Sequence, residues 1–296
     1  MDQPGQAEGA GRIGRGPRLL SDDDPRVAYA TCSRFPYGDE DFEAVSFALG
    51  GVACDPIAWD APGAAWNRYD LVVIRATWDY TDRVEEFLAW AHSMSRLFNA
   101  ADVVEWNHDK RYLAALHASG VPTIPTRWDP AELAPGHYVV KPTISAGARD
   151  TIAGEADAAI AHVRALNDAG RRAMVQPYVD GIDQHGETAL LYVGDRFSHA
   201  VRKGAVLGAS RRADGTYAPE QVEPRVPSTA EHELAELALD SIPFDRASLL
   251  YARVDLVPGP DGDPVLLELE LIEPSLFLAQ SADGAALLAG AIVAKL

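Results

Sequence analysis

The stretch that decides the fold runs from residue 251 to residue 275 and reads YARVDLV (251–257), PGPDGDP (258–264) and VLLELELIEPS (265–275). Two apolar, β-prone runs on either side of a Pro, Gly and Asp cluster predict a β-hairpin. Asp255, near the end of the first strand, can then face Glu268 and Glu270 on the second. Because side chains alternate along a strand, the two glutamates share one face of the hairpin.

These carboxylates are candidate metal ligands. Buried on one face, they would repel each other and lose their hydration unless a positive charge lay between them. Three hard oxygen ligands suit Mg²⁺, which proteins usually hold with one or two carboxylates plus substrate phosphates. The alternative is a solvent-facing acidic strand, although the run is rich in Leu and Ile. The hairpin alone leaves a magnesium site at Asp255, Glu268 and Glu270 and a solvated acidic strand as equal possibilities.

Composition excludes several classes of protein. The chain has 296 residues, 47% of them apolar and 24% charged, which is typical of a soluble globular protein with two or three units. A net charge of −18 argues against nucleic-acid binding, which needs clustered Lys and Arg. Cys32 and Cys54 form neither a disulfide framework nor a metal-type spacing, so a cytoplasmic location is expected. We find no apolar run that could span a membrane and no signal-peptide core.

The chain divides by pattern. A strand, a helix and the apolar run at 71–74 predict a parallel α/β sheet near the N-terminus. The segment 204–227 has little pattern and is interpreted as a loop over the site. The predicted units are a mobile tail (1–25), an N-terminal α/β domain (26–105), a central lobe (106–177) and a C-terminal lobe (178–296).

Arg75 follows the apolar run, at the carboxyl end of a predicted parallel strand. Ligands bind at such strand ends in open α/β sheets, so Arg75 could hold a substrate carboxylate with two hydrogen bonds. An ion pair with Asp79 or Asp82 is an equally good interpretation.

Two lysines are placed to meet an anion. If Asn107 or Asp109 caps a helix, Lys110 lies in its first turn, where a cation is uncommon unless an anion is close. Lys141 ends a strand and precedes a loop of small residues, whose backbone N–H groups could approach phosphate oxygens. That loop lacks the Gly-Lys-Ser/Thr ending of a P-loop, and a plain hairpin is its alternative.

Pro177 cannot donate to a sheet, so the strand at 173–179 is predicted to break into an extended hinge. The backbone groups of such a hinge fit the donor and acceptor of an adenine edge. Further on, two runs separated by a turn predict a hairpin that ends at Arg202 and Lys203. These two side chains point to opposite faces, so at least one can face a pocket.

Two separated lysines, a small-residue loop, a hinge and three carboxylates are the parts of a nucleoside triphosphate site. In this order, from Trp106 to Ser275, they resemble the ATP-grasp superfamily, in which two α+β lobes sandwich ATP behind an N-terminal parallel α/β (pre-ATP-grasp) domain. Many members have Asn where Glu270 stands. The resemblance implies ATP and Mg²⁺ as cofactors and assigns nucleotide contacts to Lys110, Lys141, Ser145, Gly147, Gln176, Tyr178, Val179 and Glu187, metal contacts to Asp255, Glu268 and Glu270, and catalysis to Arg253, Lys203 and Lys141.

The motifs RATWDY (75–80), SHAVRK (198–203) and ELELIEPS (268–275) resemble more narrowly the O-ureido-serine cyclo-ligases of cycloserine biosynthesis. That resemblance implies that ATP phosphorylates a substrate carboxylate, that a nitrogen of the same molecule attacks the acyl phosphate, and that ADP and phosphate are released as O-ureido-D-serine becomes D-cycloserine. A nucleophile within the substrate has a large effective molarity and needs no protein nucleophile. The implied substrate contacts are Arg75, Arg202, Glu273 and Ser275.

Two other functions remain open on the sequence. An intermolecular carboxylate–amine ligase of dipeptide type would need a second amine substrate, and a non-catalytic ATP-binding protein would bind ATP without turnover. We expect a small amino-acid substrate, no nucleic-acid or membrane partner, and a monomer or homodimer.

Overall fold

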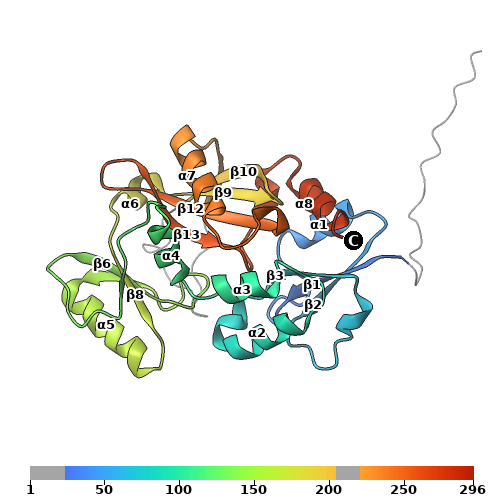
Figure 1. Ribbon diagram of the computed structural model, residues 1–296, viewed down its shortest axis with the longest axis horizontal. Helices are drawn as coiled ribbons and strands as arrows, with labels where there is room; N and C mark the ends of the chain where they lie inside the picture. Colours follow the sequence, from blue (N-terminus) through green and yellow to red (C-terminus); the bar gives the residue numbers. More distant parts are fainter. Residues whose placement is uncertain (1–23, 205–220) are drawn as a thin grey trace, which may run out of the picture.

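The computed structural model describes residues 24–204 and 221–296, and this part of the chain folds around three β-sheets (Figure 1). Each sheet takes its strands from one segment of the chain, namely 26–98, 127–177 or 187–270. The predicted tail at 1–25 and the predicted loop at 204–227 lie mostly outside the described residues.

The N-terminal unit is a parallel sheet with strand order β2-β1-β3-β4, as the strand–helix–strand rhythm predicted. β3 is buried along its whole length because α1 and α8 cover one face of the sheet and α2 and α3 cover the other. Its elements are β1 (Arg26–Thr31), α1 (Phe42–Ala48), β2 (Ala53–Ala58), β3 (Leu71–Ala76), the 3-10 turn η2 (Trp78–Asp82), α2 (Val84–Ser93), β4 (Leu97–Phe98) and α3 (Ala101–Asn107).

The central lobe is a small antiparallel sheet, β5-β8-β6-β7, with α5 packed on it. Val140 from the sheet and Val163 and Leu166 from the helix form its separate core. Its elements are β5 (Arg127–Trp128), β6 (His137–Pro142), β7 (Ile152–Glu155), α5 (Ala156–Asp168) and β8 (Ala173–Pro177). The preceding helix α4 (Tyr112–Ala118) packs instead in the core of the C-terminal lobe.

The C-terminal lobe is built on the antiparallel sheet β11-β10-β9-β12-β13. Its last two strands confirm the hairpin predicted from the opening stretch. The closing helix α8 returns to pack beside α1, so the first and last elements share one core (Figure 1). Its elements are α6 (Gly181–His185), β9 (Glu187–Val193), β10 (Arg196–Lys203), β11 (Val222–Arg225), α7 (Thr229–Asp240), β12 (Tyr251–Pro258), β13 (Pro264–Glu270), the 3-10 turn η4 (Leu278–Gln280) and α8 (Gly284–Val293).

Polar side chains from the first half of the chain hold the end of the hairpin. The amide of Asn107 donates to the carbonyl of Leu269 (2.9 Å) and accepts the N–H of Leu271 (2.8 Å). The hydroxyl of Tyr112 accepts the N–H of Leu269 (2.9 Å), and Asn99 donates to the carbonyl of Leu271 (2.6 Å). β13 would otherwise be a sheet edge with unpaired backbone groups, so these bonds set where its carboxylates lie.

The prediction that Lys110 lies in the first turn of a helix is wrong. α3 ends at Asn107 and α4 begins only at Tyr112. Between them the Lys110 N–H donates to the carbonyl of Thr143 (2.8 Å), which ties this turn to the end of β6. Lys110 is therefore placed by a contact between distant segments rather than by a helix dipole.

Arg75 also departs from the prediction, since it has no exposed surface and its charge is neutralised inside the N-terminal unit. Its guanidinium lies 3.1 Å from Asp39 and 3.9 Å from Asp41, not against Asp79 or Asp82. Asp41 in turn accepts the N–H of Leu278 (3.2 Å). The ion pair thus joins β3, the segment before α1 and the C-terminal lobe.

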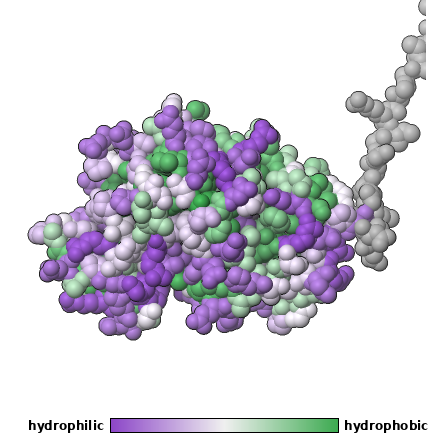
Figure 2. Space-filling model, in the orientation of Figure 1, coloured by the Kyte–Doolittle hydropathy of each residue, from purple (hydrophilic) through white to green (hydrophobic). Residues whose placement is uncertain are grey.

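The surface is largely hydrophilic on the face shown in Figure 2, with hydrophobic residues gathered near α8. Within the described ranges, no helix has both the length and the apolar character that a membrane crossing would require. The expected location and oligomeric state stay predictions.

Replacing Arg75 with Ala should destabilise the protein strongly, because Asp39 and Asp41 would be left buried without their counter-ion. We expect a loss of about 3–5 kcal/mol in the free energy of unfolding, measured by urea denaturation. The exposed Arg68 is the matched control, and Arg68→Ala should change stability by no more than about 0.5 kcal/mol. Equal effects of the two substitutions would contradict a structural role for Arg75.

Candidate active site

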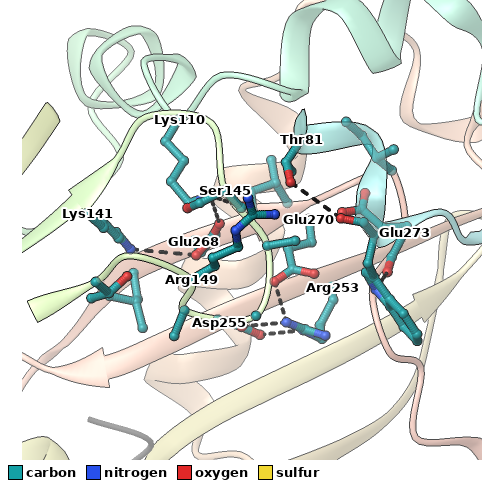
Figure 3. Close-up of a pocket in the computed structure, with 18 of the residues that line it drawn as sticks. Thr81, Lys110, Lys141, Ser145, Arg149, Arg253, Asp255, Glu268, Glu270 and Glu273 are labelled. Carbon is teal, nitrogen blue, oxygen red and sulfur yellow. Dashed lines mark hydrogen bonds and ion pairs between the residues drawn. The ribbon is translucent and has the colours of Figure 1, made fainter. Parts of the chain in front are cut away.

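A cavity of about 980 Å³ lies where the three units meet (Figure 3). Its wall takes residues from η2 in the N-terminal unit, from β6 and β8 in the central lobe, and from β12 and β13 in the C-terminal lobe. All residues predicted for nucleotide binding, metal binding and catalysis lie on it: Lys110, Lys141, Ser145, Gly147, Gln176, Tyr178, Val179, Glu187, Lys203, Arg253, Asp255, Glu268 and Glu270.

Strand register sets the acidic floor of the cavity. Asp255 is directly opposite Glu268 and Arg253 is directly opposite Glu270 in the antiparallel pair. Side chains that face each other across two strands lie within reach of one another. One hairpin therefore presents three carboxylates and one guanidinium on a single surface.

Asp255 is held by two cations. Lys203 Nζ lies 2.7 Å from its carboxylate and 2.7 Å from that of Glu187, while Arg253 Nε lies 2.9 Å from the other Asp255 oxygen. Burial alone would raise the pKa of Asp255, but Arg253 and Lys203 outweigh it and lower the pKa to about 2. Arg253 also contacts Glu270. Asp255 is thus ionised at neutral pH.

Glu268 is held by the two lysines that the sequence assigned to phosphate. Lys110 Nζ lies 3.0 Å from one oxygen of Glu268, and Lys141 Nζ lies 3.6 Å from the other. Burial would raise the pKa of this carboxyl, yet the lysines keep it below its usual range. Lys110 also donates to the carbonyl of Ser145 (2.7 Å), which draws the small-residue loop toward the hairpin.

The positive charge that the sequence required between the carboxylates is supplied here by lysine and arginine side chains. No group of three His, Cys, Asp or Glu residues in the described ranges is gathered closely enough to hold a metal. Asp255, Glu268 and Glu270 nevertheless offer oxygen donors from adjacent strands to one cavity, and that chemistry fits Mg²⁺. The magnesium site stays a prediction.

Two glutamates of the cavity are harder to ionise. Burial, reinforced by Asp255 and Glu268, raises the pKa of Glu270 to about 7 although Arg253 opposes it. Burial, reinforced by Glu270 and Glu268, raises the pKa of Glu273 to about 8 although Lys110 opposes it. The cavity wall therefore carries more carboxyl groups than its lysines and arginines neutralise.

The predicted hinge is present, but one of its backbone N–H groups is already hydrogen-bonded within the protein. β8 ends at Pro177, as predicted, and the Gln176 side chain donates to Thr126 (3.0 Å). The N–H of Tyr178 donates to His137 (2.9 Å), so it is not available to a ligand as the sequence suggested. Among the described residues, the N–H of Val179 has no backbone partner, and the adenine contact of the hinge stays a prediction.

The four predicted substrate contacts divide into two pairs. Glu273 and Ser275 lie on the cavity wall, whereas Arg75 and Arg202 do not. Arg202 donates instead to the carbonyls of Gln184 and His185 beside α6. Lys203, its neighbour, faces the cavity, because successive side chains of a strand alternate. The structure therefore does not bring Arg75 and Arg202 to the cavity wall, and the four substrate contacts stay predictions.

The structure adds an ion pair that the sequence did not reveal. Arg149, in the small-residue loop, donates to both oxygens of Asp82 at the end of η2, at 2.7 and 2.5 Å. Both residues lie on the cavity wall, so the pair links the central lobe to the N-terminal unit. Arg149 stood in the predicted loop, but no local pattern pointed to a partner so far away in the chain.

Comparison with known proteins gives several matches. A family model described as the N-terminal domain of D-cycloserine synthetase DcsG matches residues 27–99. The cycloserine biosynthesis protein DcsG of Streptomyces lavendulae is 35% identical over 276 residues, which cover 83% of this chain and 90% of the relative. The crystal structure of D-cycloserine synthetase DcsG has a TM-score of 0.79 and 32% identity, covering 91% of this chain and 99% of that one.

More distant structures share the fold. The ATP-grasp ligase PsnB, complexed with its minimal precursor, Mg and ADP, has a TM-score of 0.58 at 16% identity, covering 95% of this chain and 99% of that one. The D-alanine–D-alanine ligase of Bacillus anthracis has a TM-score of 0.58 at 12% identity, covering 92% and 97%. The predicted ATP-grasp fold is confirmed.

The raised pKa of Glu273 gives a test of stability against pH. Because the folded form keeps this proton up to about pH 8 and the unfolded form loses it near the ordinary value of 4.5, the contribution to stability is full below pH 4.5 and lost as the pH rises to 8. The Tm of ligand-free Glu273→Gln should therefore rise relative to the original protein between pH 5 and 8. Glu85→Gln, at an exposed site, controls for loss of one charge. A constant difference across this range would contradict the assignment.

Proposed function

Because the chain belongs to the DcsG family of ATP-grasp ligases, we propose that it closes the ring of D-cycloserine from O-ureido-D-serine at the expense of ATP. In this proposal the substrate carboxylate becomes an acyl phosphate, the oxygen-bound ureido nitrogen of the same molecule attacks it, and ADP and phosphate leave. Water then removes the carbamoyl group from that nitrogen as carbamate, which breaks down to CO2 and ammonia. The observation that carries the proposal is the single cavity in which two lysines, a small-residue loop and an acidic hairpin converge.

Nucleotide binding would change the ionic partners of several side chains in the cavity. Lys110 and Lys141 are paired with Glu268, and their ammonium groups suit nucleotide phosphates. On nucleotide binding they would turn to the phosphates and release Glu268, which with Asp255 and Glu270 would hold Mg²⁺. Bound there, Mg²⁺ would neutralise charge on the transferring phosphoryl group. The two lysines and the three carboxylates would each keep a partner before and after nucleotide binding, which avoids an unpaired buried charge.

Arg253 is the proposed donor to the oxyanion. Its guanidinium lies on the cavity wall, fixed by Asp255 at 2.9 Å and by the carbonyl of Ser275 at 3.1 Å. A donor held in place before the reaction stabilises developing charge without having to reorganise. Lys203 contacts both Glu187 and Asp255, so it would hold a predicted nucleotide contact and a predicted metal ligand at a fixed separation.

Arg253→Ala should leave ATP binding largely intact and lower kcat by about 10²- to 10³-fold. Binding is measured by calorimetry, and turnover by release of ADP and phosphate with O-ureido-D-serine. Arg68→Ala is the control for loss of an arginine. ATP binding with no turnover in either form would favour a non-catalytic ATP-binding protein, and a requirement for a second amine would favour the intermolecular ligase.

Asp255→Asn and Glu268→Gln should each raise the Mg²⁺ concentration that gives half-maximal turnover by at least about tenfold. The physical reason is that an amide oxygen carries no net charge to attract the ion. Asp261→Asn, in the exposed turn of the same hairpin, is the matched control and should not alter the Mg²⁺ dependence. An unchanged Mg²⁺ requirement in both site variants, as in the control, would show that Asp255 and Glu268 are not metal ligands.

A further inference from the structure

Glu273 lies just beyond β13 on the cavity wall, with 9% of its surface exposed. Its backbone is fixed from the N-terminal unit, because Trp78 Nε1–H donates to its carbonyl at 3.0 Å. Trp78 itself packs edge-on against Phe35, with ring centroids 4.8 Å apart, and both rings line the same cavity. The three residues form one corner of the site, here called the Glu273 corner.

The carboxyl group of Glu273 differs from those of the three predicted metal ligands on the hairpin. Asp255, Glu268 and Glu270 each contact a lysine or an arginine. Within residues 24–204 and 221–296, neither a hydrogen bond nor an ion pair joins the Glu273 carboxyl to another group. Burying a carboxylate without a partner is costly, and a stable fold keeps such a group mainly where a ligand supplies the partner.

The surroundings say which kind of ligand fits. The charged groups around Glu273 are Glu270, Glu268, Lys110 and Arg253, and the Tyr80 hydroxyl is also near. Burial, together with the two glutamates, raises the pKa of Glu273. Lys110 and Arg253 are each engaged by a different carboxylate. A carboxyl group beside an aromatic ring is an environment in which proteins bind ammonium groups, and a bound cation would favour the ionised form of Glu273.

We propose that the Glu273 corner is the subsite for the α-ammonium group of the substrate, with Glu273 as its counter-ion and Trp78 as its aromatic wall. The proposal rests on the proposed ligase function and narrows its substrate class. The acceptor is then an amino acid with an unblocked α-ammonium group, and acids that lack this group are rejected. Glu273 is thereby a specificity-determining residue rather than a metal ligand.

The test compares two substrates that differ only in this group. O-ureido-D-serine and its des-amino analogue, 3-(ureidooxy)propanoic acid, are assayed for ADP release at saturating MgATP with the original protein and with Glu273→Gln. Glu273→Gln should lower kcat/KM for the amino acid by about 10- to 100-fold, mainly through KM, and leave the des-amino acid within about threefold. Glu273→Asp should recover part of the loss, and calorimetric MgATP binding checks that the variants fold.

Several outcomes would overturn the proposal. Equal losses with both substrates would show that Glu273 does not meet the ammonium group. A fall in kcat alone would make it a proton-transfer group, and a shift in the Mg²⁺ requirement would make it a metal ligand.

Failure of the ligase function is distinguishable from failure of the subsite. If the original protein releases no ADP with O-ureido-D-serine, calorimetry with the two acids in the presence of ATP still tests the corner. Binding of the amino acid that is at least about tenfold tighter than that of the des-amino acid, and lost in Glu273→Gln, would support the subsite without the reaction. Equal or absent binding of both acids would overturn it.

Discussion

The pairing of buried acids with buried bases across one β-hairpin is the constraint on which the site depends. Asp255 and Glu268 face each other from adjacent strands, and each is kept ionised by two cations. Without Lys203, Arg253 and the two lysines on Glu268, burial would drive these carboxyl groups toward the neutral form. The same cations are the groups that a polyphosphate would attract. In the proposed function these internal ion pairs would be exchanged for contacts with a nucleotide and a metal.

The hairpin can carry this charge because other parts of the chain hold its backbone. Asn107 and Tyr112 hydrogen-bond to β13 from outside the sheet, and Asn99 donates to Leu271, the residue directly after it. The turn that carries Lys110 is tied to the end of β6 through Thr143, so that the two phosphate-directed lysines come from segments joined to each other. All three units therefore contribute to the position of a single carboxylate, Glu268. This shared support explains why the cavity lies at their junction rather than within one lobe.

Arg75 and Glu273 are two buried ionisable residues outside the paired carboxylates of the hairpin, and their surroundings differ. Arg75 is neutralised by Asp39 and Asp41, and it joins the N-terminal sheet to the C-terminal lobe. It has no surface to offer a ligand. Glu273 is almost as deeply buried, yet no cation among the described residues contacts its carboxyl group. A buried charge that meets its counter-ions joins parts of the fold, whereas a buried carboxyl group without a partner inside a cavity points to a ligand that brings one.

The sequence by itself determined the short-range features of this protein. Two apolar runs around a Pro, Gly and Asp cluster predicted the hairpin, and alternation along a strand predicted the shared face of its glutamates. The apolar run at β3 predicted a parallel sheet, and the order of motifs resembled the ATP-grasp superfamily. Only the tertiary structure decided which charges meet. It placed Arg75 and Arg202 away from the cavity and joined Arg149 to Asp82. The reason is physical: periodicity reports the face on which a side chain lies, but its counter-ion comes from a segment tens to hundreds of residues away, and burial of both together decides whether a charge serves the fold or a ligand.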